Sequence, residues 1–177
     1  MKRFLIVVDM QKDFVDGALG SPEAQAIVPN VMDKILGFEG QIFATLDTHV
    51  ANYMETAEGK KLPVPHCIKG TPGWMLDDGV AAALEQKGYT PVEKLTFGSV
   101  MLPRLLYQAA GGEPFTAELI GLCTDICVVS NALMLKANFP EMEISVDSAC
   151  CAGVTPESHE NALASMKMCQ ISVTNIP

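Results

Sequence analysis

The 177-residue sequence is short of positive charge, because 12 lysines and arginines face 21 aspartates and glutamates and the formal net charge is −9. It contains no cluster of lysine and arginine. Proteins bind nucleic acids and anionic membranes through a positive surface field, so neither partner is expected. No stretch approaches the roughly 18 consecutive apolar residues that a membrane-spanning helix needs. A small-molecule partner is the better expectation.

No secretory leader is expected from the first residues of the sequence. Only the short run Phe4 to Val8 follows the first three residues, and Asp9 interrupts it. We therefore expect a cytoplasmic protein, in which the six cysteines remain free thiols. The hydrophobic share of 49% is enough for one core, and the length fits a single domain over residues 1–177.

Short apolar runs alternate with helical patterns along the chain. Six runs are expected to be strands: Phe4–Val8, Gln41–Leu46, Thr90–Glu93, Ala117–Gly121, Glu143–Val146 and Gln170–Thr174. Continuous apolar strands that alternate with helices are typical of a parallel sheet covered on both faces. The predicted fold is a three-layer, doubly wound α/β sandwich with a mostly parallel six-stranded sheet.

Helix start and stop signals lie between these strands. Ser21 offers an N-cap before Pro22, opening a helix to about Leu36 that Gly37 can end. Further helices are expected at 78–87, 103–110, 124–138 and 156–168. The exception is the stretch 47–77, which we expect to be a loop. A loop of that length inside a compact domain is usually functional.

Reactive side chains follow four of the predicted strands. In open α/β sheets, ligands bind beyond the carboxyl ends of the strands. Those positions hold Asp9, Asp47, His49, Lys94, Cys123 and Cys127. Taken singly, Asp9 reads as a cap, Lys94 as a solvated lysine and Cys127 as a small buried hydrophobe. Their joint placement favours catalysis, since an acid, a cation and a thiol would converge on one point.

Cys127 is the candidate nucleophile. It falls in the first turn of the helix expected from Thr124, where unpaired N–H groups and the positive dipole end favour an anion. With Lys94 nearby, we expect the thiolate to be stabilised relative to the ordinary cysteine pKa of about 8.5. The same N–H groups can hold an oxyanion when the thiolate attacks a carbonyl. Asp9 can take the thiol proton and deliver it to a leaving amine.

Five segments carry a resemblance to a known family. They are Val8-Asp9-Met10-Gln11-Lys12-Asp13-Phe14, Asp47-Thr48-His49, His66-Cys67 with Gly70-Thr71-Pro72-Gly73, Glu93-Lys94, and Gly121-Leu122-Cys123-Thr124-Asp125-Ile126-Cys127-Val128. In order and spacing the chain resembles the isochorismatase-like cysteine hydrolases, in particular their nicotinamidase/pyrazinamidase branch. The resemblance implies an Asp9–Lys94–Cys127 triad that deaminates an amide through a thioester. It also implies a cis peptide between Leu122 and Cys123, which aims the N–H of Cys123 beside that of Cys127 to form an oxyanion hole.

A divalent metal site is implied by the same resemblance. Asp47, His49 and His66 match its ligands, and Glu58 is the best candidate for an intervening carboxylate. Such a mixed set of nitrogen and oxygen donors suits Zn, with Mn or Fe as alternatives. The commonest pattern places a second histidine six residues after the first, where this chain has Glu55, so Glu55 and Glu58 compete. Both histidines can instead be loop residues with structural hydrogen bonds.

The substrate is less closely defined than the reaction. The resemblance implies conversion of nicotinamide to nicotinate and ammonia, with Phe14 as one pocket wall. However, Pro63 stands where many nicotinamidases place a ring-stacking tryptophan, and Trp74 is expected to have a buried packing role. His159 has no motif around it and is expected to face solvent or pack locally.

Several alternatives stay open at this point. The chain can be a cysteine hydrolase of another small amide or carbamoyl compound. It can also be an isochorismatase-type hydrolase, although such enzymes generally lack the nucleophilic cysteine, or a noncatalytic binding module. The family tends to associate, which allows a homo-oligomer.

Overall fold

A six-stranded sheet forms the centre of the structure, a computed structural model that describes residues 1–175. The strands are β1 (Lys2–Val8), β2 (Gln41–Asp47), β3 (Thr90–Lys94), β4 (Phe115–Leu122), β5 (Glu143–Ala152) and β6 (Ser172–Thr174). Their spatial order is β3-β2-β1-β4-β5-β6, and every neighbouring pair is parallel. The sheet is therefore doubly wound, with its order reversing between β1 and β4.

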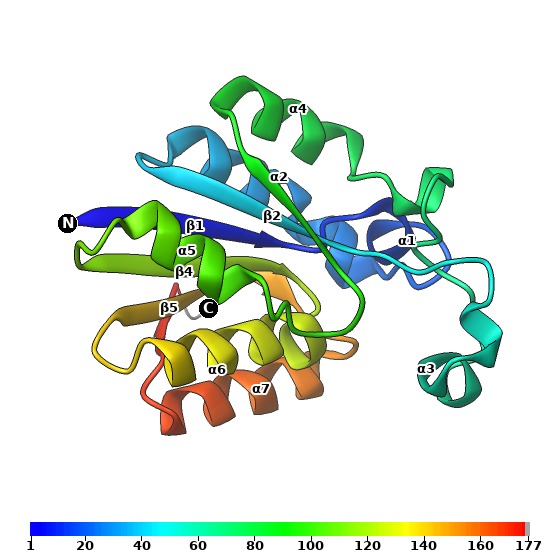
Figure 1. Ribbon diagram of the computed structural model, residues 1–177. Coiled ribbons are helices and arrows are strands. Elements are labelled where there is room, and N and C mark those ends of the chain that lie inside the picture. The colour runs from blue at the N-terminus through cyan, green and yellow to red at the C-terminus, as the bar shows by residue number, and fades with distance from the viewer. Residues whose placement is uncertain (176–177) are drawn as a thin grey trace.

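Helices cover both faces of this sheet, as Figure 1 shows. One face carries α2 (Pro22–Gly37) and α4 (Asp78–Lys87), and the other carries α5 (Leu102–Ala110), α6 (Val129–Asn138) and α7 (Pro156–Met168). Shorter elements are α1 (Lys12–Val15), α3 (Ala57–Lys61), the 3₁₀ segments η1 (Tyr53–Glu55) and η2 (Pro72–Trp74), and the π-helical turn η3 (Thr124–Val128). The three layers confirm the predicted fold class. Within residues 1–175, no helix combines the length and the apolarity needed to cross a bilayer.

Strand β1 shows why the sheet needs both helical layers. Phe4, Ile6 and Val8 pack among α5, α6 and α7, whereas Leu5 and Val7 pack among α2 and α4. Side chains alternate across a strand, so a strand that is apolar at every position requires cover on both sides. The five side chains are buried almost completely.

Glycine is required where β4 lies closest to its parallel neighbour β1. Gly121 pairs with Val8 and has a φ of +114°, a backbone conformation that L side chains rarely adopt. A Cβ at this position would collide with the backbone of Val8. The two strands therefore approach closely at the point where the sheet order reverses.

The capping signals in the sequence work as expected. The hydroxyl of Ser21 accepts a hydrogen bond from the N–H of Ala24 at 3.0 Å, at the start of α2. Thr155 and Ser158 form a reciprocal capping box at the start of α7. Such caps satisfy N–H groups that have no partner within the helix.

The structure differs from the sequence-based expectation in several elements. The helix predicted over 124–138 begins with the π-helical turn η3, because the N–H of Val128 reaches back to the carbonyl of Cys123 at 3.0 Å. Strand β5 runs well past Val146, and β6 is shorter than predicted. Helix α1 was not predicted, because a single turn is too short to show helical periodicity.

The stretch 47–77 is not the plain loop that we expected. It contains η1, α3 and η2, and His49 forms a parallel β-bridge with Ile68. These short elements provide hydrogen-bond partners for backbone N–H and C=O groups within the stretch. In Figure 1, α3 stands apart from the layers, beyond the carboxyl end of β2.

Candidate active site and metal centre

The candidate site lies at the carboxyl ends of four strands, where the sheet order reverses. Asp9 directly follows β1, Asp47 ends β2, Lys94 ends β3, and Cys127 lies in η3 after β4. All four residues are buried. Parallel strands present their carboxyl ends at one edge, which is how residues 118 positions apart meet here: Cys127 is 127 − 9 = 118 positions after Asp9.

The side chain of Lys94 connects the acid to the thiol. Its Nζ lies 2.6 Å from Oδ2 of Asp9 and 3.5 Å from Sγ of Cys127. It also donates to the carbonyl of Thr96 at 3.1 Å. The other carboxylate oxygen of Asp9 accepts a hydrogen bond from the hydroxyl of Thr45 at 2.6 Å. The three residues predicted to act together therefore lie in one hydrogen-bonded group.

Burial dominates the electrostatics of this group. Burial raises the pKa of Asp9, against the opposing effect of the Lys94 ammonium. Burial alone would lower the pKa of Lys94, but the charges of Asp9, Cys127 and Asp47 outweigh it and raise that pKa. The Lys94 ammonium therefore favours the charged form of Asp9, and burial opposes it.

The thiol of Cys127 does not behave as the sequence suggested. Burial, and after it the nearby carboxylate of Asp9, raise the pKa of Cys127 well above its usual value, and Lys94 offsets only part of this effect. The expectation of a stabilised thiolate is therefore wrong for the resting site. The physical reason is that the thiol is 5% exposed and faces an anion as well as a cation. If Cys127 is the nucleophile that the resemblance implies, a base has to remove its proton first.

The backbone shortly before Cys127 contains a non-proline cis peptide bond. The peptide bond between Leu122 and Cys123 is cis, at the position that the resemblance implies. The carbonyl of Cys123 accepts hydrogen bonds from the N–H groups of Ile126 and Val128, at 3.1 and 3.0 Å. The turn that carries Cys127 is thus folded back on Cys123.

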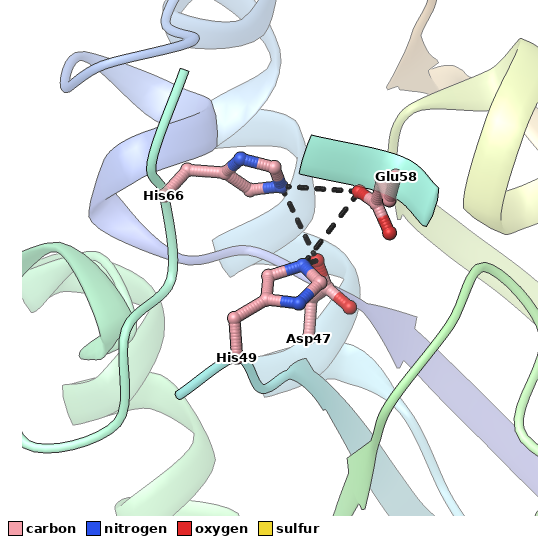
Figure 2. Close-up of side chains that lie close together, drawn as sticks. All are labelled: Asp47, His49, Glu58 and His66. Carbon is pink, nitrogen blue, oxygen red and sulfur yellow. Dashed lines mark hydrogen bonds and ion pairs between the residues drawn. The ribbon is translucent and has the colours of Figure 1, made fainter. Parts of the chain in front are cut away.

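A compact cluster of four side chains, one of which is Asp47, lies beside this group (Figure 2). Asp47, His49, Glu58 and His66 each offer one ligand atom, and these atoms lie within 4.8 Å of one another. Nε2 of His49 is 3.0 Å from Oδ2 of Asp47, and Nε2 of His66 is 3.6 Å from Oε1 of Glu58. Glu55, the competing carboxylate, is exposed and lies outside the cluster.

The surroundings orient these ligand atoms toward one another. Nδ1 of His66 lies 2.8 Å from the carbonyl of Val64, which directs Nε2 of the same ring into the cluster. The Tyr53 ring packs edge-on against both imidazoles, with ring centroids 4.8 Å from His49 and 5.0 Å from His66. Two imidazole nitrogens and two carboxylate oxygens at this spacing fit a first-row divalent metal.

A small pocket joins the two groups. It is lined by Phe14, Leu19, Asp47, Glu58, Leu62, His66, Phe97, Cys123, Ile126 and Cys127. Its volume is about 50 Å³, and most of its walls are apolar. Pro63 is exposed, and Trp74 is half-buried outside this lining, where its indole N–H donates to the hydroxyl of Thr48 at 3.0 Å. No tryptophan therefore stacks over the pocket in the part of the chain that the structure describes.

Comparison with known proteins identifies the family. The isochorismatase domain model matches residues 3–176. The chain belongs to the isochorismatase family. The resemblance carried by the five sequence segments is thereby confirmed, and the chain is a hydrolase of this family.

Individual isochorismatase-family relatives are similar over nearly their whole length. The nicotinamidase/pyrazinamidase of Mycobacterium tuberculosis is 26% identical, with 97% of each chain covered. The crystal structure of the nicotinamidase/pyrazinamidase PncA from Bacillus subtilis matches with a TM-score of 0.85 at 27% identity, covering 99% of this chain and 100% of that one. The pyrazinamidase of Pyrococcus horikoshii, crystallised in complex with zinc, matches with a TM-score of 0.79 at 26% identity and the same coverage.

Two features of this isochorismatase-family site escaped the sequence. Asp47 belongs to both groups, because its Oδ1 lies 3.2 Å from Nζ of Lys94 while its Oδ2 faces His49. Gln11 fixes that strand end, since its side chain accepts from the N–H of Asp47 at 2.7 Å and donates to its carbonyl at 2.8 Å. Gln11 belongs to the first of the five segments that resemble the family, but nothing in the sequence shows that it bonds to Asp47.

His159 is the third residue whose place the sequence did not reveal. The expectation that it faces solvent or packs locally is wrong, because its ring contacts the turn that carries Cys127. Its Nδ1 lies 2.7 Å from the hydroxyl of Thr124. Residues 124 and 159 are joined by tertiary packing alone, and no sequence signal connects them.

Proposed function

We propose that the protein is an amidohydrolase that converts nicotinamide to nicotinate and ammonia. One observation carries the proposal. Asp9, Lys94 and Cys127 form a single buried group beside a four-residue cluster that fits a divalent metal. The names of the nicotinamidase and pyrazinamidase relatives support the same reaction class.

Proton transfer opens the proposed mechanism. The carboxylate of Asp9 takes the thiol proton of Cys127, and the ammonium of Lys94, already in contact with both, stabilises the thiolate that forms. The sulfur then attacks the amide carbonyl carbon. Because the thiol is neutral at rest, Asp9 is needed as a base at the moment of attack.

Two backbone groups complete the first half of the reaction. The N–H groups of Cys123 and Cys127 hold the oxyanion of the tetrahedral intermediate, a role for which one donor is typically worth about 3–4 kcal/mol. Asp9 returns its proton to the departing nitrogen, the C–N bond breaks, and ammonia leaves a thioester on Cys127. Asp9 next takes a proton from water, the hydroxide attacks the thioester, the C–S bond breaks, and Asp9 returns the proton to the sulfur as the acid leaves.

The metal ligands proposed are Asp47, His49, Glu58 and His66. When bound there, zinc, the metal in the structure of the Pyrococcus horikoshii relative, supplies an electrophilic position beside the pocket. The chain's own contribution is to hold two imidazoles and two carboxylates in place and to keep that position next to Cys127 through the shared pocket lining.

Pocket size supports a small substrate. The pocket has a volume of about 50 Å³ and its lining includes Phe14 and Phe97, so it favours a small molecule over a peptide or polymer. The lack of a stacking tryptophan over the pocket also favours a second candidate, a small amide or carbamoyl compound without an aromatic ring.

Ammonia release from purified protein tests the proposal. The panel contains nicotinamide, pyrazinamide, benzamide, which lacks a ring nitrogen, and a simple carbamoyl compound, each with and without a chelator. We expect nicotinamide to be turned over fastest and chelation to reduce its turnover. Preferred hydrolysis of the carbamoyl compound would select the second candidate, and no ammonia from any member would refute the amidohydrolase assignment.

A further inference from the structure

We propose that His159 is a positioning residue, which holds the turn of the nucleophile in its reactive geometry through Thr124. The proposal rests on the proposed function, because its first measure is amide hydrolysis. His159 is not among the residues that line the pocket, so it acts through another group. Because His159 belongs to α7, this helix contacts η3 from outside the pocket.

The contacts of His159 bridge two elements. Nδ1 lies 2.7 Å from the hydroxyl of Thr124, and Nε2 lies 3.3 Å from the hydroxyl of Ser148 in β5. Thr124 is fully buried and is the first residue of η3, directly after Cys123. A neutral imidazole donates at one nitrogen and accepts at the other, and hydroxyl groups can answer both needs. The ring thus links the start of η3 to the first turn of α7, while its other nitrogen faces β5.

A second tie joins the same two segments. The N–H of Val154 donates to Oδ1 of Asp125 at 3.1 Å, one residue beyond Thr124. Gly153 packs so closely that an added Cβ would lie 2.8 Å from the backbone nitrogen of His159. The β5–α7 connection therefore lies directly against the turn that carries Cys127.

We call the contacts of His159 and Val154 with η3 the clamp, and the first turn of α7 anchors it. His159 stands in the first turn of α7, one residue after the capping box of Thr155 and Ser158, and its N–H donates to the carbonyl of Thr155 at 3.0 Å. The capping box satisfies backbone N–H groups of the turn from which the ring projects. Since η3 supplies the nucleophile and its neighbour Cys123 the proposed oxyanion donor, a small displacement of Thr124 would misalign both relative to the substrate carbonyl.

Four substitutions test the proposal. His159→Ala should lower kcat by about tenfold, with KM within about twofold of wild type, because one buried hydrogen bond to the turn is lost while the pocket lining is kept. An asparagine at position 159 can place a polar atom near the position of Nδ1, so His159→Asn should restore most of kcat. His159→Gln instead reaches toward Ser148 and should restore little. Thr124→Val should reproduce the alanine variant, and the double variant should lose no more than either single one.

Ser148→Ala is the matched control, because it removes the bond on the other side of the ring. We expect its kcat to stay near the wild-type value. Equal losses in the Asn and Gln variants, an unchanged kcat in His159→Ala, or strictly additive losses with Thr124→Val would each overturn the positioning role. Melting temperatures of all variants separate loss of geometry from loss of fold.

A substrate-independent measurement keeps this inference separate from the proposed function. The rate at which iodoacetamide alkylates Cys127 is followed by peptide mass spectrometry. Loosening η3 should expose the thiol and raise this rate severalfold in His159→Ala and Thr124→Val, but not in Ser148→Ala. If wild type hydrolyses no amide yet these rates follow that pattern, the proposed function fails and the clamp stands. Unchanged rates in the alanine and valine variants would refute the clamp.

Discussion

The two halves of the site are held in different ways. Asp9, Asp47 and Lys94 stand at the ends of neighbouring parallel strands, and Asp47 and Lys94 are direct partners in the β2–β3 ladder. Glu58 and His66 instead come from the long connection 48–77. The side chains of Asp9 and Lys94 are 0% and 1% exposed, whereas that of Glu58 is 20% exposed.

This difference shows where the site is rigid and where it can adapt. Strand ends are fixed by ladder hydrogen bonds, so the proposed proton-transfer group is built into the sheet. Glu58 lies on the five-residue helix α3, which Figure 1 shows apart from the layered body. His66 is intermediate, because its ring is buried and bonded to Val64. We therefore expect substitutions at the strand ends and in η3 to remove activity, and substitutions in the connection to weaken metal binding by degrees.

The largest effect is expected from Cys127→Ala. Removal of the nucleophile should reduce ammonia release from nicotinamide by about 10⁴-fold or more, because no other group can form the thioester. The measurement is kcat together with the melting temperature. Cys169→Ala, at an exposed cysteine, is the control and should retain activity. Substantial turnover by folded Cys127→Ala would exclude the covalent mechanism.

Asp9→Asn should come next in magnitude. An amide cannot accept the thiol proton, so we expect kcat to fall by about 10²–10⁴-fold. Bound metal, measured by elemental analysis, should not change, since Asp9 is outside the cluster. Asp16→Asn changes an exposed carboxylate and is the control variant for kcat and bound metal. Loss of metal in Asp9→Asn would mean that the two halves are not separable in the way proposed.

Graded losses of metal are expected in the connection. His49→Ala should abolish stoichiometric zinc binding, whereas Glu58→Gln should weaken it by about 10–100-fold, because α3 is the least anchored support. Glu55→Gln is the matched control and should bind zinc as wild type does. The measurements are zinc content after dialysis and affinity in competition with a chelator. If all three variants bind zinc as tightly as wild type does, the proposed metal site is refuted.

The smallest effect concerns pH. Burial raises the pKa of Asp9 above its ordinary value of 3.8. The base is active as the carboxylate, so kcat/KM should be full above this raised pKa and should fall as the pH decreases through it. Thr45→Val removes the hydroxyl that stabilises the carboxylate, and should move this acid limb upward by roughly one pH unit or less.

Zinc content must be followed over the same pH range, because loss of the metal in acid would also lower activity. An acid limb that coincides with zinc loss, or that stays in place in Thr45→Val, would contradict the assignment of the limb to Asp9.

Much of the fold could be predicted because strands buried on both faces leave a direct trace. Phe4 to Val8 is apolar at every position, and the largely apolar runs before Asp47 and Cys123 predict that these residues stand at strand ends. The short elements of 48–77 could not be predicted, since segments of three to five residues are too short to show periodicity.

Residue pattern and motif spacing were enough to predict the parallel doubly wound sheet, the family, and the set of residues that approach one another at the carboxyl edge of the sheet. The packing of the elements was needed to show that Glu58 rather than Glu55 joins the cluster, that Asp47 touches both groups, and that His159 contacts the turn of Cys127. It also decided the protonation of Cys127, because a pKa depends on burial and on every neighbouring charge. Periodicity and spacing record which face of an element is buried, but distances between side chains of separate elements arise only when those elements pack.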